Sequence, residues 1–203
     1  MELIFFTVKM SDLSDRLLRL NINNPTKGDH FKKVKTLGSG AFGRVDLSRV
    51  VLEKPYAKIE DKVAIKRFVV SNAEMAKKEA KVLNRLNHEY IVSYHDIFIN
   101  AKRQFCIVME FCDRGSLEDY LNSPEFEKPF PECFIWRLVW QFSTALSFLH
   151  GQRPPILHND LKPANILCKT NRDNLTDIKI ADFGVCNVLG EIKINLHCII
   201  MVN

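Results

Sequence analysis

The hydrophobic period of this chain changes close to Gly115, and that change limits the fold more than any other feature of the sequence. Before it, apolar residues recur mainly at alternate positions in short segments, which is typical of strands with one buried face. After it, they recur at the spacing of helix turns. A chain with this pattern is expected to build a sheet first and a mainly helical part second.

The individual elements follow from the pattern and from the turn residues between them. We expect strands around Val34–Thr36, Val45–Leu47, Val63–Ile65, Val92–Phe98 and Gln104–Met109, and an amphipathic helix at Ser71–Leu86. The longest helix is expected at Pro131–His150, followed by short strands at Ile166–Cys168 and Ile178–Ile180. The sequence therefore predicts an α+β fold, a five-stranded sheet with one helix and then a helical part, with a ligand cleft between two lobes.

Composition and charge exclude several classes of protein. With 203 residues, 46% of them apolar, the chain can bury one sizeable core, and its net charge of +5 is too mild for a nucleic-acid-binding face. Its six cysteines form no Cys-x-x-Cys pair, which argues against a zinc site or a disulfide framework. No signal peptide or membrane-spanning stretch is evident. We expect a cytoplasmic and/or nuclear chain without nucleic-acid or membrane partners.

Residues 1–30 are expected to form an extension that precedes the main domain. Ser11 to Leu20 has the pattern of a short capped helix, and residues 21–29 have the polar composition of a linker. A surface helix with no special role is the plainer interpretation. The alternative is a helix that docks on the first lobe or on a partner.

A glycine-rich run from Gly38 to Val45 follows the pattern G-x-G-x-x-G-x-V. Glycines let a turn approach phosphates closely, because no Cβ obstructs the backbone N–H groups. A hairpin without any ligand can have the same spacing, and so can the dinucleotide-binding fingerprint, which requires a helix after the turn. Because a strand follows here, a hairpin that covers a nucleotide fits better.

Lys66 ends a strand whose neighbouring residues are apolar. An ammonium group in such surroundings needs an anion, since an unpaired buried charge is costly. Glu79, on the following helix, is a suitable partner. Taken singly, Lys66 is also typical of a solvated strand end, and Glu79 of a solvated helix face.

Two runs in the second half carry further polar groups. Within His158–Asn165, Asp160 precedes Asn165 by five positions in a loop after the long helix, which can bring a base and a metal ligand together. Asp182, followed by Phe and Gly after a strand, can bring a carboxylate to Mg²⁺. Taken alone, the first run fits a loop that ends a helix, and the second fits a common turn.

In their order and context, these four runs resemble the motifs of the eukaryotic protein kinase family. The loop Asp160–Asn165 is similar to its serine/threonine version, and the resemblance runs from about Phe31 to Leu189. It implies ATP and Mg²⁺ as cofactors and a protein substrate with a serine or threonine hydroxyl. It also implies a two-lobed fold, with an antiparallel five-stranded first lobe at 31–112 and an incomplete, mainly helical second lobe at 113–189.

The resemblance also implies a role for each site residue. The catalytic set is Asp160, Lys162, Lys66 and Glu79. The metal ligands are Asn165 and Asp182. The nucleotide-binding set is Gly38, Ser39, Gly40, Ala41, Phe42, Gly43, Val45, Ala64, Lys66, Met109, Glu110, Cys112 and Leu167. A hydrophobic column that aligns the lobes consists of Leu83, Tyr94, His158 and Phe183.

The sequence departs from the family pattern at two places. Asn159 stands where the family usually has Arg, which implies that activity does not depend on a phosphorylated activation loop. Residues 190–203 do not resemble a kinase, so we expect a partial domain with a non-kinase-like tail. The apolar face of Pro131–His150 would then lack much of its usual partner surface.

Three functional hypotheses remain open from the sequence. The first is an enzyme that transfers a phosphoryl group from ATP to protein hydroxyls, supported by the expected residue type at every catalytic position. The second is a catalytically inactive fragment that binds a nucleotide or a regulatory protein partner. The third treats all four motifs as coincidental turns. Turnover that is lost on replacement of Asp160 separates the first from the second.

Overall fold

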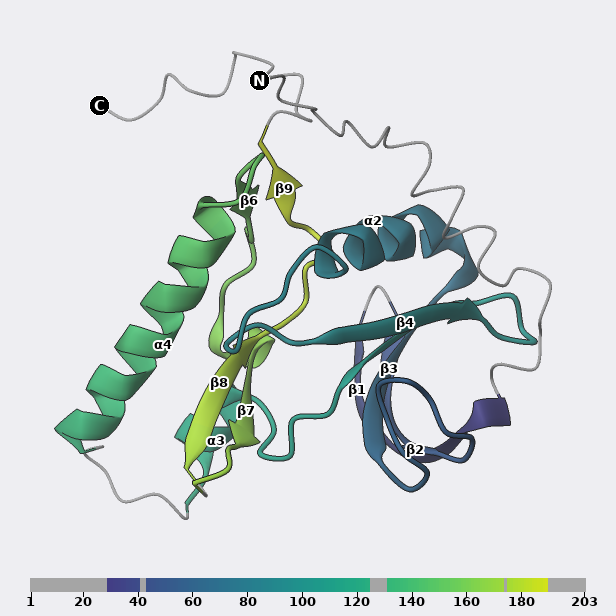
Figure 1. Cartoon of the computed structure of the whole chain (residues 1–203), viewed down its shortest axis with the longest axis horizontal. Helices are drawn as coiled ribbons and strands as arrows, with labels where there is room; N and C mark the ends of the chain where they lie inside the picture. The colour runs from purple at the N-terminus through teal and green to yellow at the C-terminus, as the bar shows by residue number, and fades with distance from the viewer. Residues whose placement is uncertain (1–28, 41–42, 125–130, 174, 190–203) are drawn as a thin grey trace, which may run out of the picture.

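The computed structural model describes residues 29–40, 43–124, 131–173 and 175–189, which are drawn in colour in Figure 1. The helix expected at Ser11–Leu20, the site residues Ala41 and Phe42, and the segment 190–203 lie outside these described residues. The sequence predictions for them stay predictions.

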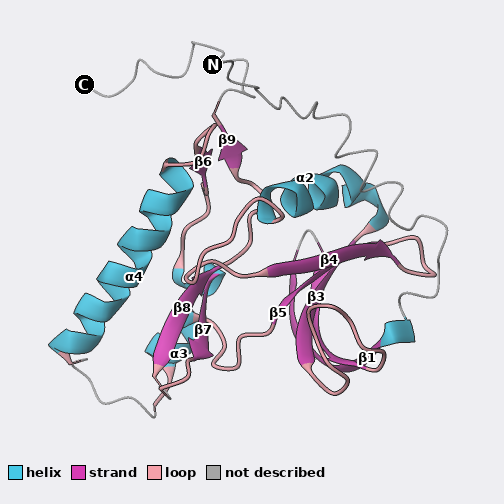
Figure 2. Cartoon of the chain, in the orientation of Figure 1, coloured by secondary structure: helices cyan, strands magenta, loops and turns pink. Residues whose placement is uncertain are grey.

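The first part of the chain forms an antiparallel sheet in the order β1-β2-β3-β5-β4 (Figure 2). Its strands are β1 Phe31–Gly40, β2 Gly43–Val50, β3 Lys62–Phe68, β4 Tyr94–Ile99 and β5 Phe105–Glu110. All four strand pairings are antiparallel. The predicted five-stranded sheet is confirmed. Strands β2, β3, β4 and β5 bury apolar residues against the cores, whereas β1 is exposed except at Phe31.

Different groups cover the two faces of this sheet. Helix α2, Ala73–Leu83, packs on one face and buries Ala76, Ala80, Val82 and Leu83 there. It follows a 3-10 turn, Val70–Asn72, and is shorter at both ends than predicted. The other face carries a smaller core that includes Ile65 and Phe98, against which Tyr56 packs from the loop between β2 and β3.

The second part consists of α3 Leu117–Asn122, α4 Glu132–His150, the hairpin β7 Ile166–Thr170 and β8 Thr176–Ile180, and the short pair β6 Ile156–Leu157 with β9 Asn187–Val188. The hairpin lies between α4 and the sheet (Figure 1). The sequence predicted α4 and the hairpin, but neither α3 nor the β6–β9 pair. Ser116 and Asp119 cap α3 reciprocally, a signal present in the sequence.

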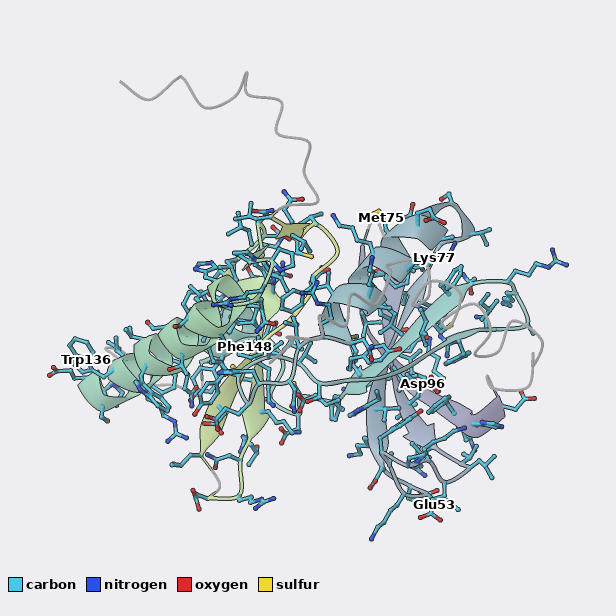
Figure 3. The ribbon with its side chains drawn as sticks, turned by 45° about the horizontal axis from the view of Figure 1, so that its top comes forward. Glu53, Met75, Lys77, Asp96, Trp136 and Phe148 are labelled. Atoms are coloured by element: carbon cyan, nitrogen blue, oxygen red, sulfur yellow. The ribbon has the colours of Figure 1, made fainter. Side chains whose placement is uncertain are left out.

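The apolar residues of α4 divide into a packed set and an exposed set. Ala145 and Leu149 are buried, and Leu138, Phe142 and Leu146 pack partly against the same core, so most of the predicted face has partners. A second set is exposed and consists of Ile135, Trp136, Val139 and Trp140. Figure 3 shows Trp136 near the end of α4 far from the sheet.

One hydrophobic core joins the two parts of the molecule. It contains residues of α2 and β5 together with Leu149 of α4, Ile180 of β8 and Phe183. The backbone also links the parts, since the Val92 N–H donates to the Ile180 carbonyl over 2.9 Å and the Ile180 N–H donates to Tyr90 over 2.9 Å. These links fix β8, and the segment after it, against the residues between α2 and β4.

Candidate active site

Lys66 lies between two carboxylates from distant parts of the chain. Its Nζ contacts Glu79 Oε1 and Oε2 over 2.8 and 2.7 Å, and Asp182 Oδ1 over 2.8 Å. Strand β3 supplies the lysine, α2 supplies Glu79, and the segment after β8 supplies Asp182. The lysine and the glutamate predicted as partners are therefore paired, and both are buried.

Electrostatics keep this lysine charged. Burial opposes the ammonium form, but the nearby carboxylates of Glu79 and Asp182 outweigh it and raise the pKa of Lys66. The Asp182 side chain is 38% exposed, and only its Oδ1 accepts hydrogen bonds from described residues. Asp182 Oδ2 is therefore the oxygen best placed to bind a further cation.

The backbone around Asp182 is held in an unusual conformation. Asp182 has a φ of 63°, in the left-handed region that few residues other than Gly, Asn and Asp adopt readily. At Gly184, an added Cβ would lie 3.3 Å from both Asp182 Oδ1 and Glu79 Oε2, closer than ordinary contact. The glycine thus lets the chain pass directly beside the two carboxylates.

The loop before β7 gathers the second group of predicted residues. Lys162 Nζ contacts Asp160 Oδ1 and Oδ2 over 3.1 and 2.9 Å, and Asn165 Nδ2 donates to the Asp160 carbonyl and to its Oδ2 over 2.8 and 2.7 Å. The hydrogen bond from Lys162 is the main cause that lowers the pKa of Asp160. Asp160 is thus ionised at neutral pH and can accept a hydroxyl hydrogen bond.

One backbone hydrogen bond and two contacts of the His158 ring connect the loop to the segment that carries Asp182. The Ala181 N–H donates to the Asn165 carbonyl over 2.9 Å, and His158 Nε2 lies 2.9 Å from the Ala181 carbonyl. The His158 ring also meets the Phe183 ring edge-on at 4.8 Å. Of the predicted column, Leu83 and Phe183 share one core, against which Tyr94 packs.

The glycine-rich turn is described on both of its sides. A Cβ added to Gly38 or Gly40 would meet nothing within 4 Å, so the side of each residue where a side chain would stand is open. A Cβ on Gly43 would lie 2.0 Å from the Arg67 carbonyl oxygen, and its φ is 148°. No other residue fits at Gly43, because the turn lies directly against β3.

Most of the residues predicted to surround the adenine lie on adjoining strands of the sheet. Val45 is paired with Lys66, and Ala64 with Met109. Ala64, Met109 and Cys112 are buried. Leu167 lies on β7 in the second part and is paired with Lys179. No described backbone group accepts a hydrogen bond from the Cys112 N–H.

Glu110, predicted for its backbone, has a buried carboxylate with three partners. It accepts from the Ser93 N–H over 2.7 Å, and it pairs with Lys169 on β7 over 2.7 Å and with Lys179 on β8 over 3.0 Å. Sequence reasoning missed both lysines. Their signal was weak, since lysines on a hairpin are usually solvated. The contacts tie the end of β5 to the hairpin that carries Leu167.

These contacts predict a specific pH dependence of stability. Burial opposes the charged form of Glu110, but Lys169, Lys179 and the Ser93 N–H outweigh it and hold its pKa at about 2. A depressed folded-state pKa contributes stability above the unfolded value and loses it as the pH falls through the folded value. We therefore expect the ionised group to contribute about 3 kcal/mol above pH ~5, and this contribution to vanish towards pH ~2.

Urea unfolding of wild type and Glu110→Gln at several pH values measures this contribution. The difference in unfolding free energy between the two chains should be largest above pH ~5 and shrink steadily below it. Glu118→Gln, which replaces an exposed glutamate, is the matched control. A wild-type-to-Gln difference that does not change with pH would contradict this reading of Glu110.

The residues present fit a magnesium nucleotide. Mg²⁺ usually takes one or two protein oxygens together with phosphates and waters. Asp182, whose Oδ2 accepts no hydrogen bond from the described residues, and Asn165 match that need. In the described part of the chain no group of three or more His, Cys, Asp or Glu side chains could hold a metal by itself.

The five described cysteines are free thiols, and burial raises the pKa of Cys112 to about 12.

Comparison with known proteins identifies the family. Residues 31–198 match the protein kinase domain, a match that includes part of the segment 190–203. The chain is 32% identical over 164 residues to MAP3K epsilon protein kinase 1 from Brassica napus, covering 81% of this chain and 12% of that protein. It is 30% identical over 177 residues to serine/threonine-protein kinase tousled-like 2 from Xenopus tropicalis, covering 85% and 25%.

The chain thus spans a quarter or less of the length of these two relatives. The family match covers the part that holds the sheet, α2, the loop before β7 and the segment after β8. The family match and the paired Lys66, Glu79 and Asp182 agree with the order of motifs in the sequence. This chain belongs to the protein kinase family.

Proposed function

We propose that the chain binds ATP with Mg²⁺ and transfers the γ-phosphoryl group to serine or threonine hydroxyls of a protein. The observation that carries the proposal is the contact of Lys66 with both Glu79 and Asp182. In a phosphoryl-transfer site, this lysine must be oriented toward the nucleotide while a carboxylate beside it holds the metal. The contacts of Lys66 support both conditions, because Glu79 holds the ammonium and Asp182 lies directly beside it.

Each residue has a task that its surroundings support. Lys66, held by Glu79, orients the phosphates, and backbone N–H groups around Gly38 and Gly40 donate to them. When bound, ATP supplies the transferable phosphoryl group, and Mg²⁺ on Asp182 and Asn165 neutralises its oxygens. Ala64, Met109 and Leu167 are proposed to enclose the adenine, and the backbone of Glu110 and Cys112 to bind its edge.

The loop before β7 is proposed to handle the protein substrate. Asp160 is ionised because its pKa is lowered by Lys162, so it orients the attacking hydroxyl and takes its proton late in the reaction. Lys162 is exposed enough to reach the transferred group and balance its charge.

The free thiols of the described cysteines support a cytoplasmic or nuclear location. In the described part, no helix has the length and apolar composition needed to cross a bilayer.

The first test is thermal unfolding of the full chain 1–203 with and without Mg-ATP. At a nucleotide concentration of ~100 times the dissociation constant, binding should add about 2.7 kcal/mol of stability and raise the midpoint clearly. Asp182→Asn should abolish most of the shift, because it removes the charged metal ligand. Asp173→Asn, in an exposed turn, is the matched control and should keep it.

If Mg-ATP did not raise the thermal unfolding midpoint of the wild type, the result would contradict the proposal. A shift in the wild type without measurable phosphoryl transfer to a generic protein substrate would instead support the alternative, a nucleotide-binding module that acts through a protein partner. Transfer together with the shift supports the enzyme.

A further inference from the structure

A buried carboxylate lies at the base of the glycine-rich hairpin, on the side of the sheet that faces away from Lys66. Asp46 follows Val45 on β2, and its side chain is 0% exposed. It meets Lys33 Nζ at 2.8 Å, Arg44 Nε at 3.1 Å and Arg67 Nε at 2.9 Å, and it accepts from Thr36 Oγ1 over 3.1 Å. Asp46, Lys33, Thr36, Arg44 and Arg67 form what we call the Asp46 cluster.

The cluster resolves a charge conflict between two strands. Arg44 on β2 and Arg67 on β3 are direct cross-strand partners. Like charges directly opposite each other destabilise a pair of strands. Asp46 contacts both guanidinium groups, and although burial opposes its charged form, the bonds from Lys33, Arg67 and Thr36 lower its pKa. The ionised carboxylate of Asp46 thus offsets the repulsion between the guanidinium groups of Arg44 and Arg67.

The same contacts tie all three strands around the turn. Lys33 and Thr36 belong to β1 and Arg44 to β2, the two strands that the glycine-rich turn connects. Arg67 belongs to β3, and its carbonyl is the group against which Gly43 packs. One residue of β3 therefore holds the hairpin twice, through its backbone at Gly43 and through its side chain at Asp46.

We propose that Asp46 is a positioning residue, whose ion cluster sets the hairpin at the height over the nucleotide that phosphate binding requires. The inference rests on the proposed nucleotide-binding function. Asp46 touches no reacting group, because it lies on the opposite face of β2 from Val45. Its effect passes through the repulsion it prevents between Arg44 and Arg67, so a loss of its charge should lift the hairpin away from β3.

The test measures Mg-ATP affinity in chains that differ only in this charge. Asp46→Asn should raise the Mg-ATP dissociation constant about tenfold. Adding Arg44→Gln to it removes one of the repelling cations and should restore most of the affinity. Added salt should also reduce the difference in Mg-ATP dissociation constant between wild type and Asp46→Asn. Salt screens the repulsion between the partly exposed cations of the Asp46 cluster. Ser48→Ala, on the same face and also fully buried, is the uncharged control.

A second readout does not depend on nucleotide. Amide hydrogen exchange at Thr36–Gly40 and Gly43–Asp46 should become faster in Asp46→Asn and return toward the wild-type rate in the double variant. If the wild type binds no Mg-ATP, the proposed function fails, and exchange alone decides the role of Asp46. An unfolded Asp46→Asn beside a folded double variant supports the charge argument. If the double variant matched Asp46→Asn in both Mg-ATP affinity and hydrogen-exchange rate, the proposed role of Asp46 would be overturned.

Discussion

Replacing Asp160 by Asn is expected to lower phosphoryl transfer about 10²- to 10⁴-fold, the usual contribution of a general base. The amide keeps the size of the side chain and can keep contact with Asn165, but it cannot accept a proton. The midpoint shift with Mg-ATP should remain, because Asp160 is proposed to act on the hydroxyl rather than on the nucleotide. Steady-state transfer to a generic protein substrate measures the effect.

The control for this experiment is Asp173→Asn, an equivalent change in an exposed turn, which should leave transfer unchanged. Equal rates for wild type and Asp160→Asn would remove Asp160 from the proposed mechanism. Loss of the Mg-ATP shift in Asp160→Asn would instead assign the residue to nucleotide binding.

Breaking the Lys66–Glu79 pair is expected to have the largest effect on stability. Glu79 is 1% exposed, and Glu79→Leu leaves a buried ammonium with Asp182 as its only close carboxylate among the described residues. Removal of one partner from a buried pair typically costs about 3–5 kcal/mol. Urea unfolding of the full chain measures the loss, which should appear as a lower midpoint with an unchanged slope.

A double variant separates the charge effect from lost packing. Adding Lys66→Met to Glu79→Leu removes the ammonium that has lost its buried glutamate partner. The two changes together replace a buried ion pair by apolar groups, which is often neutral or stabilising. Most of the lost stability should return, but the midpoint shift with Mg-ATP should not. If the double variant were as unstable as Glu79→Leu, packing around the helix would be the cause and not the charge.

The sequence predicted elements whose signal lies within a short stretch of chain. The alternating pattern of the first part predicted all five strands of the sheet, and the helical period predicted α4, because burial of one face imposes that period locally. The helix α3 was missed although its capping residues, Ser116 and Asp119, are present, since six residues carry too short a period. The β6–β9 pair was missed because two residues on each side have no period at all.

For the site, the sequence supplied residue types and their order, and the comparisons confirm the family that these imply. It could pair Lys66 with Glu79, which are thirteen positions apart on consecutive elements. That Asp182 shares the same ammonium follows only from the fold, because β8 must first be fixed against the residues between α2 and β4.

The buried ion networks around Glu110 and Asp46 belong entirely to the tertiary structure. Lys169 and Lys179 reach Glu110 across the boundary between the two parts, and Arg67 reaches Asp46 from the neighbouring strand. In the sequence, each of these is one charged residue among many, typical of a solvated surface. Burial turns them into partners, because a carboxylate removed from water remains ionised only where several donors converge on it. Local patterns thus determined the strands, helices and motifs, and the packing of distant strands decided which charges meet.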